Sequence, residues 1–271
     1  MKKIFVIILA IIIIGTGIIF TYRSGLFSQQ ESGDKEKEVM PVGKTIDRIE
    51  EKDGVEVFAD HDLSEVKEVV SEGKELKVLD TYLEGYFKVR INSDEEGFVD
   101  SRYLKTANVD IPLADPEILE DIDKKLLFIV SQEKQQMYVY QLNGDNPEKD
   151  YELIKTVDVS TGKEDDPTPN GYFTIKEYRG PWFYNSKYEV GARYFVTYRD
   201  SYLLHSVGHD ENEEVIPEKK EGLGEKNTHG CIALPLKEAK FVYEEAEEGM
   251  LLVINHSPLT PEEIYRGQYL E

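Results

Sequence analysis

The sequence predicts a mainly β protein with two β-rich domains, one C-terminal helix and an N-terminal transmembrane helix. Three observations support this prediction. An apolar run without charges occupies residues 4–20. Short segments with a period of two residues fill residues 53–107, and further β-type segments with a single helical pattern fill residues 125–256. The 271 residues, 40% of them hydrophobic, are enough for two folded domains.

The charge of the chain excludes some classes of partner. Its formal net charge is −22 at pH 7. A surface that binds nucleic acid needs an excess of Lys and Arg, so we expect no nucleic acid among the partners. Electrostatic docking on anionic lipid is disfavoured for the same reason. We assign most of the acidic residues to solubility.

Residues 1–22 predict a membrane anchor. Lys2 and Lys3 precede a 17-residue apolar run, which is near the lower limit for a helix that spans a bilayer. The positive residues favour a cytoplasmic N-terminus, which places the rest of the chain outside. A cleaved signal peptide is the alternative, but no small-residue cleavage pattern follows the run. The prediction is a single-pass protein of the cell membrane whose folded domains, including the one at residues 125–256, are extracytoplasmic.

A polar, charged segment at residues 23–52 predicts a linker that holds the following domain away from the membrane. Short strands are then predicted at residues 55–58, 75–79, 86–91 and 96–99, which together suggest a small β-barrel at 53–107. This stretch resembles the bacterial SH3-like family. The resemblance rests on Val-x-Val at 55–57, Gly-Tyr-Phe-Lys-Val at 85–89 and the closing motif at 96–104. It implies a module that binds the cell wall or serves only as a spacer.

A second linker is predicted at residues 108–124, where Pro112 and Pro116 stand among acidic residues. The domain at 125–256 is mostly β, and the aromatic residues of 182–184 are assigned to its core. One helix is predicted from about Pro235 to a stop at Gly249, followed by a final strand and a tail at 257–271. The strands are expected at residues 126–130, 136–142, 152–159, 173–176, 193–198, 202–205 and 250–255, and the buried helix face at Leu236, Ala239, Val242, Tyr243 and Ala246.

The residues that carry chemistry lie around the chain's only cysteine, Cys231. An exported chain with one cysteine cannot form an internal disulfide, so the thiol is a candidate nucleophile. Thr228, His229 and Gly230 precede it, and a glycine at this position allows a tight turn that brings peptide N–H groups to a developing oxyanion. His205 ends a predicted strand and is the candidate base that raises the thiolate fraction.

These motifs resemble the YkuD-type L,D-transpeptidase family, whose signature is an upstream His followed by Ser/Thr-His-Gly-Cys. The likeness covers residues 126–256, about half of the chain. It is carried by the motifs at residues 159–163, 168–175, 204–206, 223–224 and 228–234, together with the last helix and strand.

The resemblance implies a mechanism. The Cys231 thiolate attacks the carbonyl of the third residue of a peptidoglycan tetrapeptide stem and expels the terminal D-alanine. An amine on a second stem then resolves the thioester and gives a 3→3 cross-link. His205 is the base, oriented by the carbonyl of Ser206; the backbone N–H groups of Gly230 and Cys231 form the oxyanion hole, and His229 and Thr228 shape the loop. The expected partners are stem peptides, and neither a metal nor an organic cofactor is expected.

Two features depart from the family pattern. Family members generally carry Arg or Asn two residues after the nucleophile, whereas this chain has Ala233. Lys226 and Arg193 are candidates to replace that polar group. The segment between His205 and Thr228 is long and charged, which is typical of a lid over a groove and equally of a surface loop.

Several alternatives remain open from the sequence alone. His209 competes with His205 for the role of base, although its polar surroundings indicate a loop, while His61 and His256 lie outside the motif. A zinc hydrolase could use His205, His209, His229 and Cys231, although the paired ligand spacing of zinc sites is missing. Water as acceptor would make the enzyme an L,D-carboxypeptidase, and a protein amine would make it a tethering enzyme. A non-catalytic wall-binding protein is the remaining class.

Overall fold

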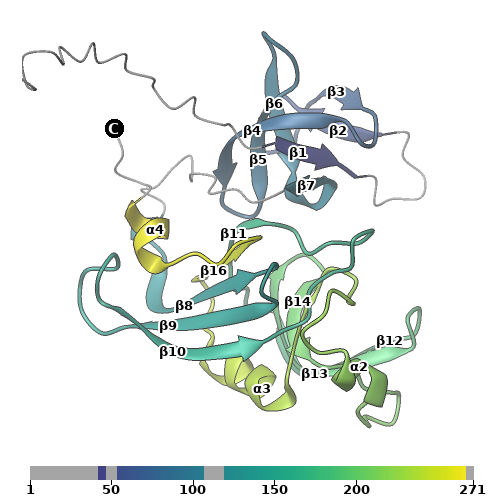
Figure 1. The fold of residues 1–271 in the computed structure, drawn as a ribbon, viewed down its shortest axis with the longest axis vertical. Helices are drawn as coiled ribbons and strands as arrows, with labels where there is room; N and C mark the ends of the chain where they lie inside the picture. The colour runs from purple at the N-terminus through teal and green to yellow at the C-terminus, as the bar shows by residue number, and fades with distance from the viewer. Residues whose placement is uncertain (1–41, 47–53, 107–118, 267–271) are drawn as a thin grey trace, which may run out of the picture. The chain divides into compact units, whose positions relative to one another are not determined.

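The computed structural model describes residues 42–46, 54–106 and 119–266 (Figure 1). All of them lie within one compact unit, Met40–Glu271. No helix in these three ranges is long and apolar enough to cross a membrane. The predicted anchor at residues 1–22 falls outside them, so it remains a prediction.

The N-terminal part of the described chain is one antiparallel sheet of seven strands in the order β3-β2-β6-β5-β4-β1-β7 (Figure 1). Alternate side chains of its strands are buried, and they form a core of their own that includes Val57, Val78, Phe87 and Val99. A 3₁₀ turn, η1 (Ser101–Tyr103), follows β6. The strands are β1 (Val42–Thr45), β2 (Val55–Phe58), β3 (Val66–Val70), β4 (Glu75–Tyr82), β5 (Tyr86–Arg90), β6 (Glu96–Asp100) and β7 (Leu104–Thr106).

The first strand of this sheet corrects the predicted domain boundary. β1 lies inside the segment interpreted as the linker 23–52, and it pairs with both β4 and β7. Four residues flanked by charged sequence are too few to show a period of two, so the strand was not recognisable. The sheet therefore begins before residue 53. The resemblance of this sheet to the SH3-like family remains a prediction.

The second part of the described chain contains two sheets. One has the order β10-β9-β8-β16-β11 and the other β12-β13-β14-β15. Most neighbours are antiparallel, but β16 pairs with β8, and β15 with β14, in parallel. The strands are β8 (Asp123–Ser131), β9 (Gln136–Leu142), β10 (Tyr151–Asp158), β11 (Gly171–Thr174), β12 (Arg179–Asn185), β13 (Val190–Arg199), β14 (Tyr202–Ser206), β15 (Ile232–Leu234) and β16 (Met250–Asn255).

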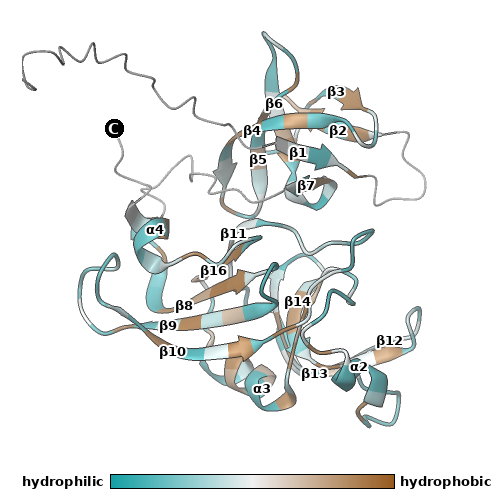
Figure 2. Cartoon of the chain, viewed as in Figure 1, coloured by the Kyte–Doolittle hydropathy of each residue, from teal (hydrophilic) through white to brown (hydrophobic). Residues whose placement is uncertain are grey.

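β8 and β16, which are neighbours in the interior of the five-stranded sheet, are buried on both faces. In β8, Phe128 packs into the core shared with the four-stranded sheet, whereas Leu127 and Ile129 pack into a second core on the opposite face. The residues of β16 divide between the two cores in the same way. Both strands are accordingly largely hydrophobic in Figure 2, in contrast to the charged helix α2 (Pro217–Glu221). This near-continuous apolar pattern is typical of strands covered on both sides.

The structure has more helices than the single one predicted, and the predicted helix has a different end. α3 (Leu236–Glu245) begins directly after Pro235 and buries Ala239 and Val242, as predicted, but it ends at Glu245 rather than near Gly249. Leu236 was predicted to be buried and is 40% exposed, because it stands at the first helical position. The tail at 257–271 contains α4 (Pro261–Arg266), which helps to cover the outer core of the five-stranded sheet.

We predict that Phe128→Ala destabilises the protein by about 3–5 kcal/mol, because the side chain is fully buried between the two sheets and its removal leaves a cavity. The matched control is Ile154→Ala on β10, where the side chain is 39% exposed and the expected loss is below about 1 kcal/mol. Urea unfolding followed by circular dichroism measures both values. Equal effects of the two substitutions would contradict the assigned core.

Candidate active site

The pairing of β14 with β15 brings the segments that carry the candidate base and the candidate nucleophile side by side. In this parallel pair Leu204 lies opposite Ile232 and His205 lies opposite Ala233. Leu204 and Ile232 are fully buried in the core between the sheets. Because side chains alternate along a strand, His205 and Ala233 lie on the other face. Cys231 directly precedes β15, so the candidate nucleophile stands at the start of the strand that pairs with the strand of the candidate base.

One hydrogen bond fixes the proton on the imidazole of His205. Its Nδ1 lies 2.6 Å from the backbone carbonyl oxygen of Ser206. A carbonyl oxygen only accepts, so Nδ1 carries the proton and Nε2 is left with a free lone pair. Phe183 packs its ring against the imidazole at a centroid distance of 5.6 Å. The ring is therefore held in the tautomer that a general base requires.

The thiol of Cys231 is held by the turn and strand before His205. Its sulfur donates to the carbonyl oxygen of Ser201 at 3.8 Å, and the backbone of Leu203 also bonds to it. Burial raises the pKa of this thiol to about 11, an effect that the Leu203 hydrogen bond opposes and the charge of Asp166 reinforces. The resting thiol is therefore protonated at neutral pH.

Burial also keeps the imidazole neutral. It lowers the pKa of His205 to about 4, against the opposing effect of the hydrogen bond to Ser206. The sequence led us to expect a raised thiolate fraction beside the imidazole. Desolvation acts in the opposite direction, because it favours the neutral thiol of Cys231 and the neutral imidazole of His205.

Side-chain hydrogen bonds hold the backbone of the nucleophile loop, residues 228–231. Gly230 has φ +95°, a conformation that side-chain-bearing residues rarely adopt. Its carbonyl oxygen accepts a 2.9 Å hydrogen bond from Thr168 Oγ1 and a longer one from the Tyr198 hydroxyl. In a trans peptide the N–H points opposite to the carbonyl, so the N–H of Cys231 is directed away from these partners. Thr228 closes the loop by donating from Oγ1 to the carbonyl oxygen of Cys231 at 2.6 Å.

His229 faces the hairpin formed by β12 and β13. Its ring stacks on Tyr188 at a centroid distance of 4.6 Å, and its Nδ1 lies 3.2 Å from the Asp166 carboxylate. Tyr188 lies in the turn of that hairpin, whose strand β12 carries Phe183. The aromatic residues 182–184 were assigned to the core, but Tyr184 is 38% exposed and Phe183 contacts His205. Sequence reasoning missed β12 because its glycine and proline hide the strand pattern.

His209 is a buried structural residue and not part of the nucleophile loop. It is 1% exposed, its Nδ1 donates to the carbonyl oxygen of Val207 at 2.7 Å, and Trp182 packs edge-on against its ring. It lies in the loop after β14, as the sequence indicated, but its backbone pairs with Gly191 and Val215 and its side chain is buried. Within the described residues, no group of three or more His, Cys, Asp and Glu side chains is placed to hold a metal.

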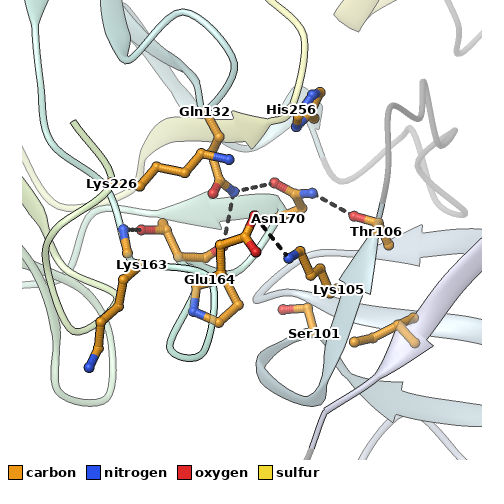
Figure 3. Close-up of a pocket in the computed structure, with 13 residues that line it drawn as sticks. Ser101, Lys105, Thr106, Gln132, Lys163, Glu164, Asn170, Lys226 and His256 are labelled. Carbon is orange, nitrogen blue, oxygen red and sulfur yellow. Dashed lines mark hydrogen bonds and ion pairs between the residues drawn. The ribbon is translucent and has the colours of Figure 1, made fainter. Parts of the chain in front are cut away.

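The structure places the residues around the unusual Ala233 as follows. Ala233 is 7% exposed, and its backbone bonds to Ser160 in addition to pairing with His205. Arg193 forms an ion pair with Glu213 at 2.6 Å. Lys226 lines a small cavity of about 40 Å³ that also borders Thr168 and Asn170 (Figure 3). The substitution of either cation for the missing polar group remains a prediction.

The charged segment between His205 and Thr228 is tied to the domain at several points. It contains α2, and its Gly222 carbonyl accepts from Ser160 Oγ and from Asn227 Nδ2. Asp210 caps a local turn by accepting from the N–H groups of Asn212 and Glu214. The role of the whole segment between His205 and Thr228 as a lid remains a prediction.

Two sequence comparisons identify the family. A model described as YkuD: L,D-transpeptidase catalytic domain matches residues 125–254. YciB of Bacillus subtilis (strain 168), whose name places it among the L,D-transpeptidases, is 33% identical over 188 residues, which cover 66% of this chain and 92% of YciB. The chain belongs to the YkuD L,D-transpeptidase family. Members of this family are enzymes, acyltransferases with a role in peptidoglycan.

Solved structures of other L,D-transpeptidases are similar to this family member in part. One from Mycobacterium smegmatis is 14% identical with a TM-score of 0.40, and the match covers 66% of this chain and 99% of that one. One from Stackebrandtia nassauensis is 19% identical with a TM-score of 0.36, and the match covers 50% and 58%. The family assignment rests on the two sequence matches.

We predict that alkylation of this transpeptidase by iodoacetamide accelerates by about tenfold per pH unit from pH 7 to 10, because only the thiolate reacts and the pKa of Cys231 is raised to about 11. Cys231 is the chain's only cysteine, so every adduct reports on it. Mass spectrometry measures the rates, with a short cysteine peptide as control, whose rate should level off above about pH 8.5. A rate that levels off near neutral pH would show a preformed thiolate–imidazolium pair.

Proposed function

We propose that this protein is an L,D-transpeptidase that forms 3→3 peptidoglycan cross-links through a cysteine thioester. Cys231 is the nucleophile and His205 is the base. Two observations support the proposal. β14, which holds His205, pairs with β15, which directly follows Cys231, and Nδ1 of His205 is bonded to Ser206 so that Nε2 is free to accept a proton.

In the first step, Cys231 attacks the carbonyl of the third residue of a tetrapeptide stem, and Nε2 of His205 takes the thiol proton as the C–S bond forms. The negative charge moves to the carbonyl oxygen, where the backbone N–H groups of Cys231 and Gly230 stabilise it. The imidazolium then gives its proton to the amine of the terminal D-alanine as the C–N bond breaks. Burial favours the neutral forms of both groups before the attack, so the oxyanion hole acts on charge that develops during it.

In the second step, an amine from the third residue of a neighbouring stem attacks the thioester. His205 removes a proton from this amine and returns it to the sulfur, which restores the neutral pair. Tyr188 and Phe183 border the site beside His229 and His205, and they supply an apolar wall for the substrate. If water takes the place of the amine, the same residues make the enzyme an L,D-carboxypeptidase.

The proposed location is the outer face of the cell membrane. The apolar run at residues 4–20 and the preceding Lys2 and Lys3 support a single-pass anchor with the catalytic domain outside. The N-terminal sheet is proposed to be an SH3-like domain, which suits a protein that works at the wall.

The proposal is tested by incubating the full-length chain with defined tetrapeptide stems and identifying the products by mass spectrometry. We expect release of D-alanine and formation of a stem dimer. Cys231→Ala should abolish both, and His205→Gln should lower the rate by on the order of 10²–10⁴-fold because a general base is lost. His61→Ala, a change of an exposed histidine in the N-terminal sheet, is the control and should leave the rate unchanged.

The products distinguish the alternatives. D-alanine without a dimer would indicate a carboxypeptidase. No D-alanine, together with no adduct on Cys231 after exposure to a carbapenem, would overturn the proposed enzyme and favour a wall-binding protein.

A further inference from the structure

A buried ion pair joins the N-terminal sheet to the hairpin beside the active site. Asp100, the last residue of β6, and Arg199, the last residue of β13, are 2.7 Å apart and only 3% and 4% exposed. Arg199 also donates to the carbonyl oxygen of Gly85 at 3.0 Å and to Ser101 Oγ at 3.1 Å. A guanidinium with this many fixed partners holds its backbone in place, because it cannot lose its charge and is costly to leave unpaired.

The same network holds the turn between β13 and β14. Arg102 donates to Asp100 and forms an ion pair with Asp200 at 3.0 Å. Asp200 is one of the two residues that connect the paired Arg199 and Tyr202, and it has φ +42°. A non-glycine residue in this conformation is strained and persists only when its surroundings hold it. The N-terminal sheet therefore fixes both Arg199 and the strained residue after it.

This turn leads directly to the nucleophile. Ser201 follows Asp200, and its carbonyl oxygen is the acceptor for the Cys231 thiol. The backbone of Leu203, two residues further on, also bonds to that sulfur and opposes the rise in its pKa. His205 stands two residues after Leu203 on the same strand. A shift of the turn would therefore move the partners of Cys231 and the strand that carries the base.

A second connection reaches the other side of the nucleophile. Asn170 donates to Thr106 Oγ1 on β7 and accepts from Nε2 of Gln132, which also donates to the carbonyl oxygen of Thr168. Figure 3 shows Gln132 and Thr106 each pointing toward Asn170 beside the cavity. Thr168 accepts from the N–H of Gly162 and donates to the carbonyl oxygen of Gly230. Every side chain in this relay is at least 90% buried.

We propose that the N-terminal sheet is a positioning part of the active site, in which Asp100 and Arg102 hold the β13–β14 turn against the Cys231 sulfur and Thr106 anchors the relay that fixes the Gly230 carbonyl. The role of these residues in turnover rests on the function proposed above. None of the three contacts the substrate. They act through Ser201, Leu203 and Thr168.

The test compares two carboxylates of one strand in the full-length chain. Glu96 and Asp100 begin and end β6, and each bonds two cations, but the partners of Glu96, Lys88 and Arg90, lie in the N-terminal sheet. We expect Asp100→Asn to lower kcat for D-alanine release by on the order of 10–100-fold, because small displacements of catalytic groups have effects of this size. KM should change much less. Glu96→Gln should stay within about twofold of wild type in both values.

Circular dichroism separates positioning from stability. If Asp100→Asn is folded at the assay temperature and keeps the wild-type kcat, the proposal is overturned, even if its melting temperature is lower. If this variant does not fold, Thr106→Val decides, with Thr45→Val as its control. Thr45 is also buried, but among the described residues its hydroxyl donates to backbone carbonyls of the N-terminal part, those of Ser71 and Lys74. A loss of kcat in Thr106→Val alone supports the proposal, and equal kcat values overturn it.

A separate measurement tests the positioning proposal if the proposed function itself fails. If wild type releases no D-alanine, that function fails, and the rate of Cys231 alkylation by iodoacetamide at pH 9 tests the positioning of the sulfur. A rate in folded Asp100→Asn that differs from wild type by more than about threefold, with Glu96→Gln unchanged, supports the proposal, since surface changes alter such values by only about twofold. Equal rates in all three proteins overturn it.

Discussion

The parallel pairing of β14 with β15 is the constraint on which the site depends. It places His205 opposite Ala233, directs Leu204 and Ile232 into the core, and begins directly after Cys231. A slip of one residue would reverse both sets of side chains. Packing of the core and alignment of the proposed catalytic pair are therefore one requirement. Ala233 suits its place in this arrangement, because its small side chain lies beside His205 on a nearly buried strand.

The burial of Cys231 and His205 also affects their protonation. Burial disfavours both the thiolate and the imidazolium, which gives pKa values of about 11 and about 4. The site therefore depends on groups that are already oriented when charge develops during attack. These groups are the Ser206 carbonyl, which fixes the proton on His205, and the peptide between Gly230 and Cys231, which Thr168 fixes from behind. According to the further inference, Asp100, Arg102 and Thr106 of the N-terminal sheet help to hold these groups in place.

Much of the fold and the centre of the site could be predicted from the sequence. Continuous apolar segments gave β8 and β16, an alternating segment gave β9, and the motif at residues 228–231 identified Cys231 as the candidate nucleophile. Short strands such as β1 and β15 carry too few residues to show a period, and their pairing comes from distant segments. The roles of Thr168, Tyr188 and Asp100 could not be found, because each depends on a contact between residues far apart in the chain. The burial of His209 could not be predicted either, because it depends on pairing with Gly191 and Val215.

The central proposal is that Nε2 of His205 takes the proton of the Cys231 thiol. The reagent 1,3-dibromoacetone tests it directly, because it alkylates a thiol and then a second nucleophile within a short reach. After reaction with the folded protein and digestion, peptide mapping by mass spectrometry should find a bridge between Cys231 and His205. A bridge from Cys231 to His229, or a sulfur alkylated without any bridge, would contradict the account.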